Sequence, residues 1–168
     1  PRPRPGREMT GVAAGHPPIF LWVKHLKESF MATIDTELAK SGKYKIVWNE
    51  AYGGTLAKIG SELETMQQGI SDVGIVGTVF QSAKMPLNNV TYFVPYGPAD
   101  ANVVTVAIDK VQALPELTAE WRKYNLVYLA GFAIDNYGLA TSFPITSMDD
   151  LKGKKIGGAG PNLAWFKN

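Results

Sequence analysis

The sequence contains no cysteine and only two histidines among its 168 residues. The lack of cysteine excludes disulfide bonds, thiolate metal sites and a cysteine nucleophile. The spacing of His16 and His25 is poor for a shared metal ion on a helix, and no pair of carboxylates completes a site with them, so we predict no metal centre. No apolar run approaches the roughly 20 residues that a membrane-spanning helix needs.

An excess of one charge is also missing, because the formal net charge is +2 at pH 7. Such a small excess does not indicate a nucleic acid or an anionic membrane surface as a partner. The chain has no G-x-x-x-x-G-K-S/T phosphate loop and no G-x-S-x-G turn, and the glycines at 157–160 lack the third spaced glycine of a dinucleotide loop. The sequence therefore favours a binding protein without a cofactor over an enzyme.

What is present is a globular composition and one clear βαβ pattern. Hydrophobic residues make up 45% of the chain, enough for the core of one ordinary domain. Residues 44–48 alternate and are rich in β-formers, Gly53 and Gly54 predict a turn, residues 56–69 carry an amphipathic helical pattern, and residues 73–77 form an apolar run. A continuous apolar strand is typical of a parallel sheet covered on both faces.

The flanking segments extend this pattern. A short apolar stretch at 9–15 predicts a first strand, and Pro17 and Pro18 suit the start of a long helix with one apolar stripe that ends at Ser41 and Gly42. Residues 100–111 read as helix, although the valines at 103–106 favour strand. The remaining expectations are a helical turn at 80–84, a helix at 115–124, strands at 126–132, 137–142 and 154–157, a capping box at 147–150 and a helix from 162.

Strands that alternate with helices predict an α/β fold with a mostly parallel sheet flanked by helices. Open sheets of this kind bind ligands at the carboxyl ends of their strands. Phe20 and Trp22 follow the first predicted strand, and Phe80 follows the strand at 73–77. We therefore expect aromatic side chains at the edge where a ligand binds.

Four segments resemble the dicarboxylate-type solute-binding proteins of tripartite ATP-independent periplasmic (TRAP) transporters. They are residues 54–56 with the helix that follows, residues 66–76, residues 93–96, and residues 144–156. The last reads P-I-T-S-M-D-D-L-K-G-K-K-I and is similar to the family motif P-I-x-S-x-x-D-L-K-G-x-K-I-R. The matches occur in the family's order over about residues 10–168.

The resemblance implies a periplasmic-binding-protein-like (type II) lobe. Residues 1–8 would be a disordered extension, residues 9–145 the first lobe, and residues 146–168 the crossover or hinge toward a second lobe that this chain does not contain. Such proteins capture a small organic solute in the periplasm, deliver it to membrane permease subunits and carry out no reaction. The precursor would carry a signal peptide, and the isolated fragment would be prone to self-association.

One departure from the family concerns the solute. The family places a carboxylate-clamping arginine directly after the Lys155–Ile156 position, where this chain has Gly157, and sialic-acid-type members have a second arginine near the position of Tyr137. Glycine cannot replace a bidentate Arg–carboxylate pair. The solute therefore lacks the usual carboxylate, being uncharged, aromatic or otherwise atypical, or its anion is held by another group, such as a helix N-terminus after His16 or a lysine at 154–155.

The resemblance and the strand-end rule together give a set of expected ligand contacts and no catalytic residues. The contacts are His16, Phe20, Trp22, Glu62, Gly77, Thr78, Val79, Tyr137, Gly157 and Asn162. For Glu62 the plain alternative is a solvated acid on the polar face of its helix. The alternative functions are a binding protein of an ATP-driven (ABC) importer, a sensory ligand-binding domain of the same fold, and an enzyme with a degenerate α/β fold.

Overall fold

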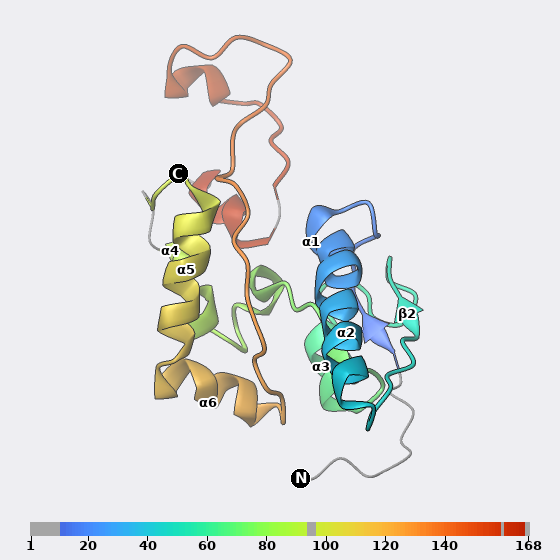
Figure 1. Cartoon of the computed structure of the whole chain (residues 1–168). Helices are drawn as coiled ribbons and strands as arrows, with labels where there is room; N and C mark the ends of the chain where they lie inside the picture. Colours follow the sequence, from blue (N-terminus) through green and yellow to red (C-terminus); the bar gives the residue numbers. More distant parts are fainter. Residues whose placement is uncertain (1–10, 94–96, 159, 167–168) are drawn as a thin grey trace.

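The computed structural model describes residues 11–93, 97–158 and 160–166, and it is a mixed α/β fold. Three short strands form a parallel sheet in the order β2-β1-β3 (Figure 1). The strands are β1 (Val12–Ala13), β2 (Glu50–Ala51) and β3 (Val73–Gly74). Val12 lies opposite Glu50 on one side and Val73 on the other, so β1 is the central strand. The prediction of a parallel sheet flanked by helices is confirmed.

The first helical region is one continuous rod made of α1 (Leu21–His25), the π-helical turn η1 (Leu26–Met31) and α2 (Ala32–Ser41). The predicted long helix is therefore confirmed, and so is its end, where Gly42 adopts the left-handed conformation at φ 61°. Its predicted start at Pro17 is wrong by four residues. The backbone first makes a turn in which the Phe20 amide donates to the Pro17 carbonyl at 3.1 Å.

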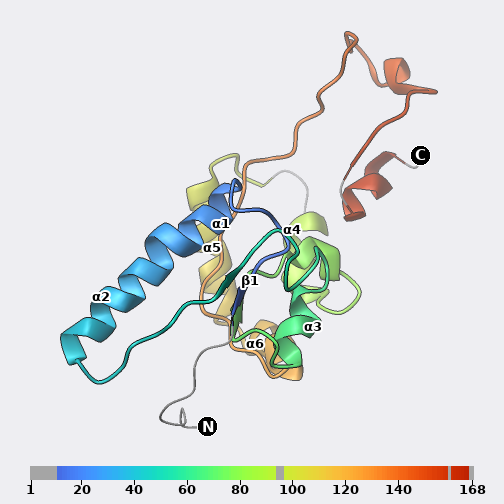
Figure 2. The same ribbon diagram turned by 90° about the vertical axis from the view of Figure 1, so that its right-hand side faces the viewer.

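The βαβ unit around the glycine turn is shorter than the sequence predicts. Residues 44–48 form no strand, and β2 begins only at Glu50. The indole of Trp48 instead donates to the Asp35 carboxylate at 2.9 Å, which fastens this segment to α2. The helix α3 (Glu62–Gln67) begins later than predicted, because Gly60, with φ +83°, interrupts the predicted helix. The helix ends in a turn at Gly69, the predicted stop, where φ is 71°. Figure 2 shows α1 and α2 on one side of β1 and α3 on the other.

The middle of the chain is helical. The elements are η2 (Thr78–Gln81), η3 (Leu87–Asn89), α4 (Val90–Phe93), α5 (Ala101–Gln112) and α6 (Pro115–Lys123). The helical turn predicted near residue 80 and the helix at 115–124 are confirmed. The ambiguous segment at 100–111 is helix, and Asp100 caps it by accepting from the Asn102 amide at 2.8 Å.

The core lies where α3, η3 and α6 meet. Leu63, Met85 and Trp121 form a buried cluster, with Val76, Tyr124, Leu126 and Tyr128 packed against it. A polar link supports the cluster, because the indole of Trp121 donates to the Asn88 side-chain carbonyl at 3.0 Å. Glu120 accepts from the Leu87 and Asn88 amides, both at 3.0 Å, so α6 also satisfies the first amides of η3.

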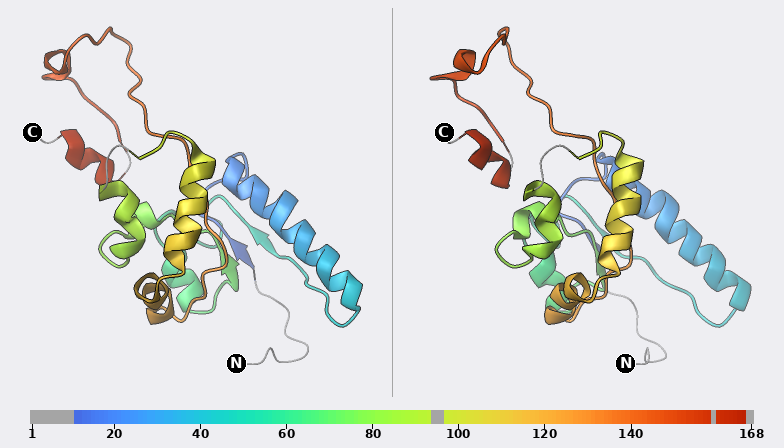
Figure 3. Two further views of the ribbon diagram at one scale, coloured as in Figure 1. Left: turned by 60° about the vertical axis from the view of Figure 1, so that its left-hand side comes forward. Right: turned by 90° about the vertical axis from the view of Figure 1, so that its left-hand side faces the viewer.

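The segment after α6 differs from its predictions. Residues 126–132, 137–142 and 154–157 form no strand among the described residues, and the predicted strands there are wrong. Figure 3 shows this segment passing α5 and then running away from the rest of the chain. The predicted capping box is confirmed, since Ser147 and Asp150 cap η4 (Met148–Leu151) reciprocally. The last element is η5 (Gly160–Phe166), a 3₁₀ helix at the predicted C-terminal helix.

Several expectations lie outside the described residues. These are the extension at 1–8, the first residues of the strand predicted at 9–15, and positions 94–96 of the family-like segment at 93–96. Within the described ranges, no helix is long and apolar enough to cross a membrane.

Candidate functional site

The carboxyl end of β1 runs directly into a tight junction between two parts of the chain. Gly15 is buried there, and a Cβ atom on it would clash with Glu62 Oε1 and would lie 2.7 Å from the Ile59 amide nitrogen. Only glycine fits such a contact without displacing its neighbours. The end of β1 is therefore pressed against the turn that begins α3.

Glu62 is the buried charged residue at this junction. Its side chain is 1% exposed, and Oε2 accepts a hydrogen bond from the Gly60 amide at 2.7 Å. The alternative of a solvated surface acid is therefore wrong for Glu62. A buried carboxylate needs hydrogen-bond donors to offset the loss of hydration, and the Gly60 amide supplies one. The position at the first turn of α3 adds the favourable end of the helix dipole.

Four aromatic groups meet just beyond Gly15. The imidazole of His16 lies 5.1 Å from the Phe20 ring, 5.3 Å from Trp22 and 6.3 Å from Phe80, measured between ring centroids. Phe20 and Trp22 are 4.7 Å apart. The first two contacts are edge-to-face, a favoured arrangement for aromatic pairs.

A fifth ring joins from the segment after α6. Phe132 stacks on Trp22 at 6.1 Å with an interplanar angle of 16°. We call His16, Phe20, Trp22, Phe80 and Phe132 the aromatic cluster. Its members come from the end of β1, the start of α1, η2 and the segment after α6, so the tertiary fold assembles it from distant parts of the sequence.

The loop after β3 closes the other side of the junction. A Cβ atom on Gly77 would lie 3.0 Å from the Phe80 ring, and the Phe80 amide donates to the Gly77 carbonyl at 2.9 Å. The Gln81 side chain donates to the Gly60 carbonyl at 2.8 Å, which joins η2 to the turn before α3. The ends of β1 and β3 and the start of α3 thus share one site.

The structure brings together most of the expected ligand contacts but not all of them. His16, Phe20, Trp22 and Glu62 surround the β1 end, and Gly77, Thr78 and Val79 lie in the adjoining β3 loop and η2. Val79 is buried. Sequence reasoning did not place Phe132 here, because its position inside a predicted strand gave no signal of a ring at the site.

Two of the other three expected contacts, Tyr137 and Gly157, lie apart from the aromatic cluster. Tyr137 pairs with Tyr92 at 6.4 Å, and burial, with a smaller contribution from Tyr137, raises the pKa of Tyr92 well above its usual value. Gly157 is exposed, with no described atom within 4 Å of its ideal Cβ position. Asn162 lies in η5, which packs on η2, and among the described residues its buried Nδ2 has no hydrogen-bond partner.

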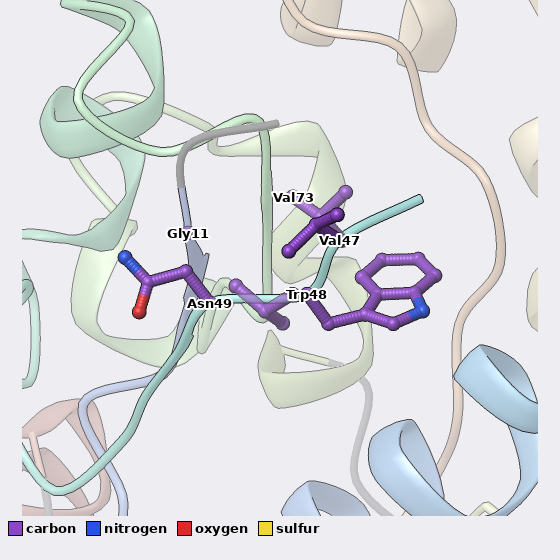
Figure 4. A pocket seen from close by; sticks show the side chains of 6 residues that line it. Gly11, Val47, Trp48, Asn49 and Val73 are labelled. Carbon is purple, nitrogen blue, oxygen red and sulfur yellow. The ribbon is translucent and has the colours of Figure 1, made fainter. Parts of the chain in front are cut away.

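Two of the hollows that the described residues line lie elsewhere on the surface. One lies at the amino ends of the strands among Gly11, Val47, Trp48, Asn49 and Val73, and it has no room for a water molecule. Figure 4 shows Trp48 and Asn49 pointing away from each other there. The other is an open hollow of about 550 Å³ between the end of α2 and residues 42–46. Neither hollow is lined by the aromatic cluster.

Comparisons with known proteins add no relative to this description. No protein-family model matches the chain, no curated protein matches it, and no solved structure matches it. Among the described residues, no group of three or more His, Cys, Asp and Glu side chains could hold a metal ion. The chemical groups that the site offers are its aromatic rings and the buried carboxylate of Glu62.

Proposed function

We propose that this chain is the first lobe of a solute-binding protein of the TRAP type, a periplasmic-binding-protein-like (type II) lobe that captures a small organic solute without altering it. Residues 9–145 would form the lobe, and residues 146–168 would lead toward a second lobe. The protein would act in the periplasm and deliver its solute to membrane permease subunits. The motifs at 54–76 and 144–156 support this family assignment.

One observation carries the proposal at the level of the site. His16, Phe20, Trp22 and Phe80 meet at the carboxyl ends of parallel strands, where open α/β sheets bind ligands. The rings are only partly buried, so they present apolar area to a solute. A second lobe that closes over this edge would bury the solute between the two halves.

The arrangement favours capture over catalysis for a chemical reason. The carboxylate of Glu62 is buried and engaged with the Gly60 amide, which leaves it poorly placed to exchange protons with a solute. Rings supply contact area and orientation rather than a nucleophile. We therefore assign the site the role of recognition.

The proposal is tested by titration calorimetry of the full-length protein against small organic acids, amines and aromatic compounds. For a compound that binds, Phe20→Ala and Phe80→Ala should each weaken affinity about tenfold, or about 1.4 kcal/mol. Phe30→Ala is the matched control, since Phe30 pairs with Trp48 at 6.4 Å, outside the aromatic cluster. If all three variants bind the compound as tightly as the wild-type protein does, this site is rejected.

A further inference from the structure

The charges around the aromatic cluster are unbalanced. Glu62 is buried beside it, and within the described ranges no lysine, arginine or histidine forms an ion pair with this carboxylate. Lys58 is the nearest basic residue in the sequence, and its side chain is exposed. The described residues include one arginine, Arg122 on α6, and Figures 1 and 2 both show α6 at the end of the fold away from α1.

The buried carboxylate borders the cluster on two sides. On one side Glu62 Oε1 faces Gly15, the residue directly before His16. On the other side Glu62 Oε2 binds the Gly60 amide, and Gly60 abuts Phe80, whose Cβ lies 3.5 Å from the ideal Cβ position on Gly60. The negative charge therefore lies next to Gly15 and Gly60, which adjoin the rings of His16 and Phe80. Because this region has low polarity, the field of the charge acts over a longer distance than in water.

The rings themselves favour the same sign of charge. The face of an aromatic ring is negative and its edge positive, so ring faces attract cations and not anions. Phe20 is 38% exposed, and His16, Trp22 and Phe80 are half-buried, so part of the cluster can be reached from solvent. A carboxylate solute would meet the field of Glu62 here without an arginine to offset it.

We infer that the aromatic cluster receives the cationic group of the solute, such as an alkylated or quaternary ammonium, with Glu62 as the charge behind the rings. This inference rests on the proposed function, which it deepens by naming the substrate class. The side chains that carry it are His16, Phe20, Trp22, Phe80 and Glu62.

The first test uses matched probes on the full-length protein. Choline is compared by titration calorimetry with its neutral carbon isostere, in which a tert-butyl group replaces the trimethylammonium group, and with succinate. We expect choline to bind at least about tenfold more tightly than the isostere, and succinate to bind least, because only the cation gains from ring faces and buried carboxylate. Equal binding of choline and the isostere, or tighter binding of succinate, would overturn the inference and leave the proposed function in place.

Variants separate charge from packing. Glu62→Gln keeps an acceptor for the Gly60 amide but removes the charge, so it should weaken choline binding about tenfold and leave binding of the isostere unchanged. Trp22→Leu, at a half-buried position, serves if Glu62→Gln does not fold, and Phe30→Leu is the control. If Trp22→Leu weakens both probes equally, the rings contribute area alone and the inference fails. If no compound of any charge binds the wild-type protein, both the inference and the proposed function fail.

Discussion

Two extended stretches of this chain have similar apolar sequences and opposite surroundings. In β1, Val12 is 2% exposed, whereas Val127 and Leu129 in the segment 126–134 are 79% and 64% exposed. Strand β1 is paired on both sides by β2 and β3, and the Ser71 hydroxyl also donates to the Gly11 carbonyl at 2.7 Å. Residue type alone therefore does not decide whether an apolar stretch is buried.

The segment 126–134 shows what a strand-forming sequence does without strand partners. The Leu126 amide donates to the Trp121 carbonyl at 3.1 Å, and the Ala133 amide donates to the Thr105 hydroxyl at 3.0 Å. Leu126 and Tyr128 pack against the core cluster from one face only. One face is thus anchored to the α5–α6 region, and the opposite face, with Val127 and Leu129, is left to solvent.

The largest expected effect sharpens this contrast directly. Leu63→Ala removes a fully buried side chain from the core cluster and should lower the free energy of unfolding by about 2–5 kcal/mol. Leu129→Ala makes the same chemical change at an exposed site and should cost no more than about 0.5 kcal/mol. Urea denaturation followed by circular dichroism measures both. A large loss in Leu129→Ala would show that the segment 126–134 is buried against something.

The next effect concerns the junction behind the candidate site. Gly15→Ala places a methyl group against Glu62 and the Ile59 backbone and should destabilise the fold by about 1–3 kcal/mol. Gly138→Ala is the matched control in the segment after α6, because no described atom lies within 4 Å of its ideal Cβ position. Thermal unfolding compares the two, and equal melting temperatures would contradict the close packing at the end of β1.

A smaller effect tests the anchored face of the segment 126–134. The Tyr128 hydroxyl donates to Asp109 at 3.2 Å, and burial, followed by the charge of Asp109, raises the pKa of Tyr128 to about 12. Because the folded-state pKa lies above the ordinary value of 10.0, this stability is complete below pH 10 and is lost as the pH rises toward 12. Tyr128→Phe should cost at most about 1 kcal/mol at neutral pH and should reduce alkaline destabilisation. Denaturation at pH 7 and pH 11 tests this, and an unchanged alkaline loss would contradict it.

The smallest effect is local to the exposed turn at η4. Hydrogen bonds from the Thr146 and Ser147 amides lower the pKa of Asp150 below its ordinary value of 3.8. A lowered folded-state pKa means that the capping contribution is present above pH 3.8 and is lost as the pH falls through the folded value. The amide resonances of Thr146 and Ser147 should therefore shift with a midpoint below pH 3.8, and a midpoint above it would refute the cap.

Local signals predicted much of this fold, and the misses share one cause. Gly42 and the box at Ser147 and Asp150 each act within a few residues, so they were correctly placed as helix ends. The strands predicted at 44–48 and 126–132 need partners elsewhere in the chain, and propensity does not report whether those partners are near. The valines at 103–106 were ambiguous for the same reason, and the structure places them in α5, whose first turn Asp100 caps.

The candidate site divides along the same line. Aromatic residues after predicted strands pointed to Phe20, Trp22 and Phe80, because strand ends can be located from apolar runs and glycines. The burial of Glu62 was not predictable, since it depends on Gly15 meeting the turn before α3. Phe132 was missed because its approach to Trp22 joins segments separated by most of the chain.

By itself, the sequence determined the α/β class, several helix ends and the kind of side chain found after the strands, because these depend on periodicity, capping and backbone freedom over a few residues. The tertiary structure alone decided which apolar stretch became the central strand, which acidic side chain was buried away from solvent and which aromatic rings came together. Those outcomes depend on hydrogen bonds and burial between segments far apart in the chain, and no local pattern encodes such distances.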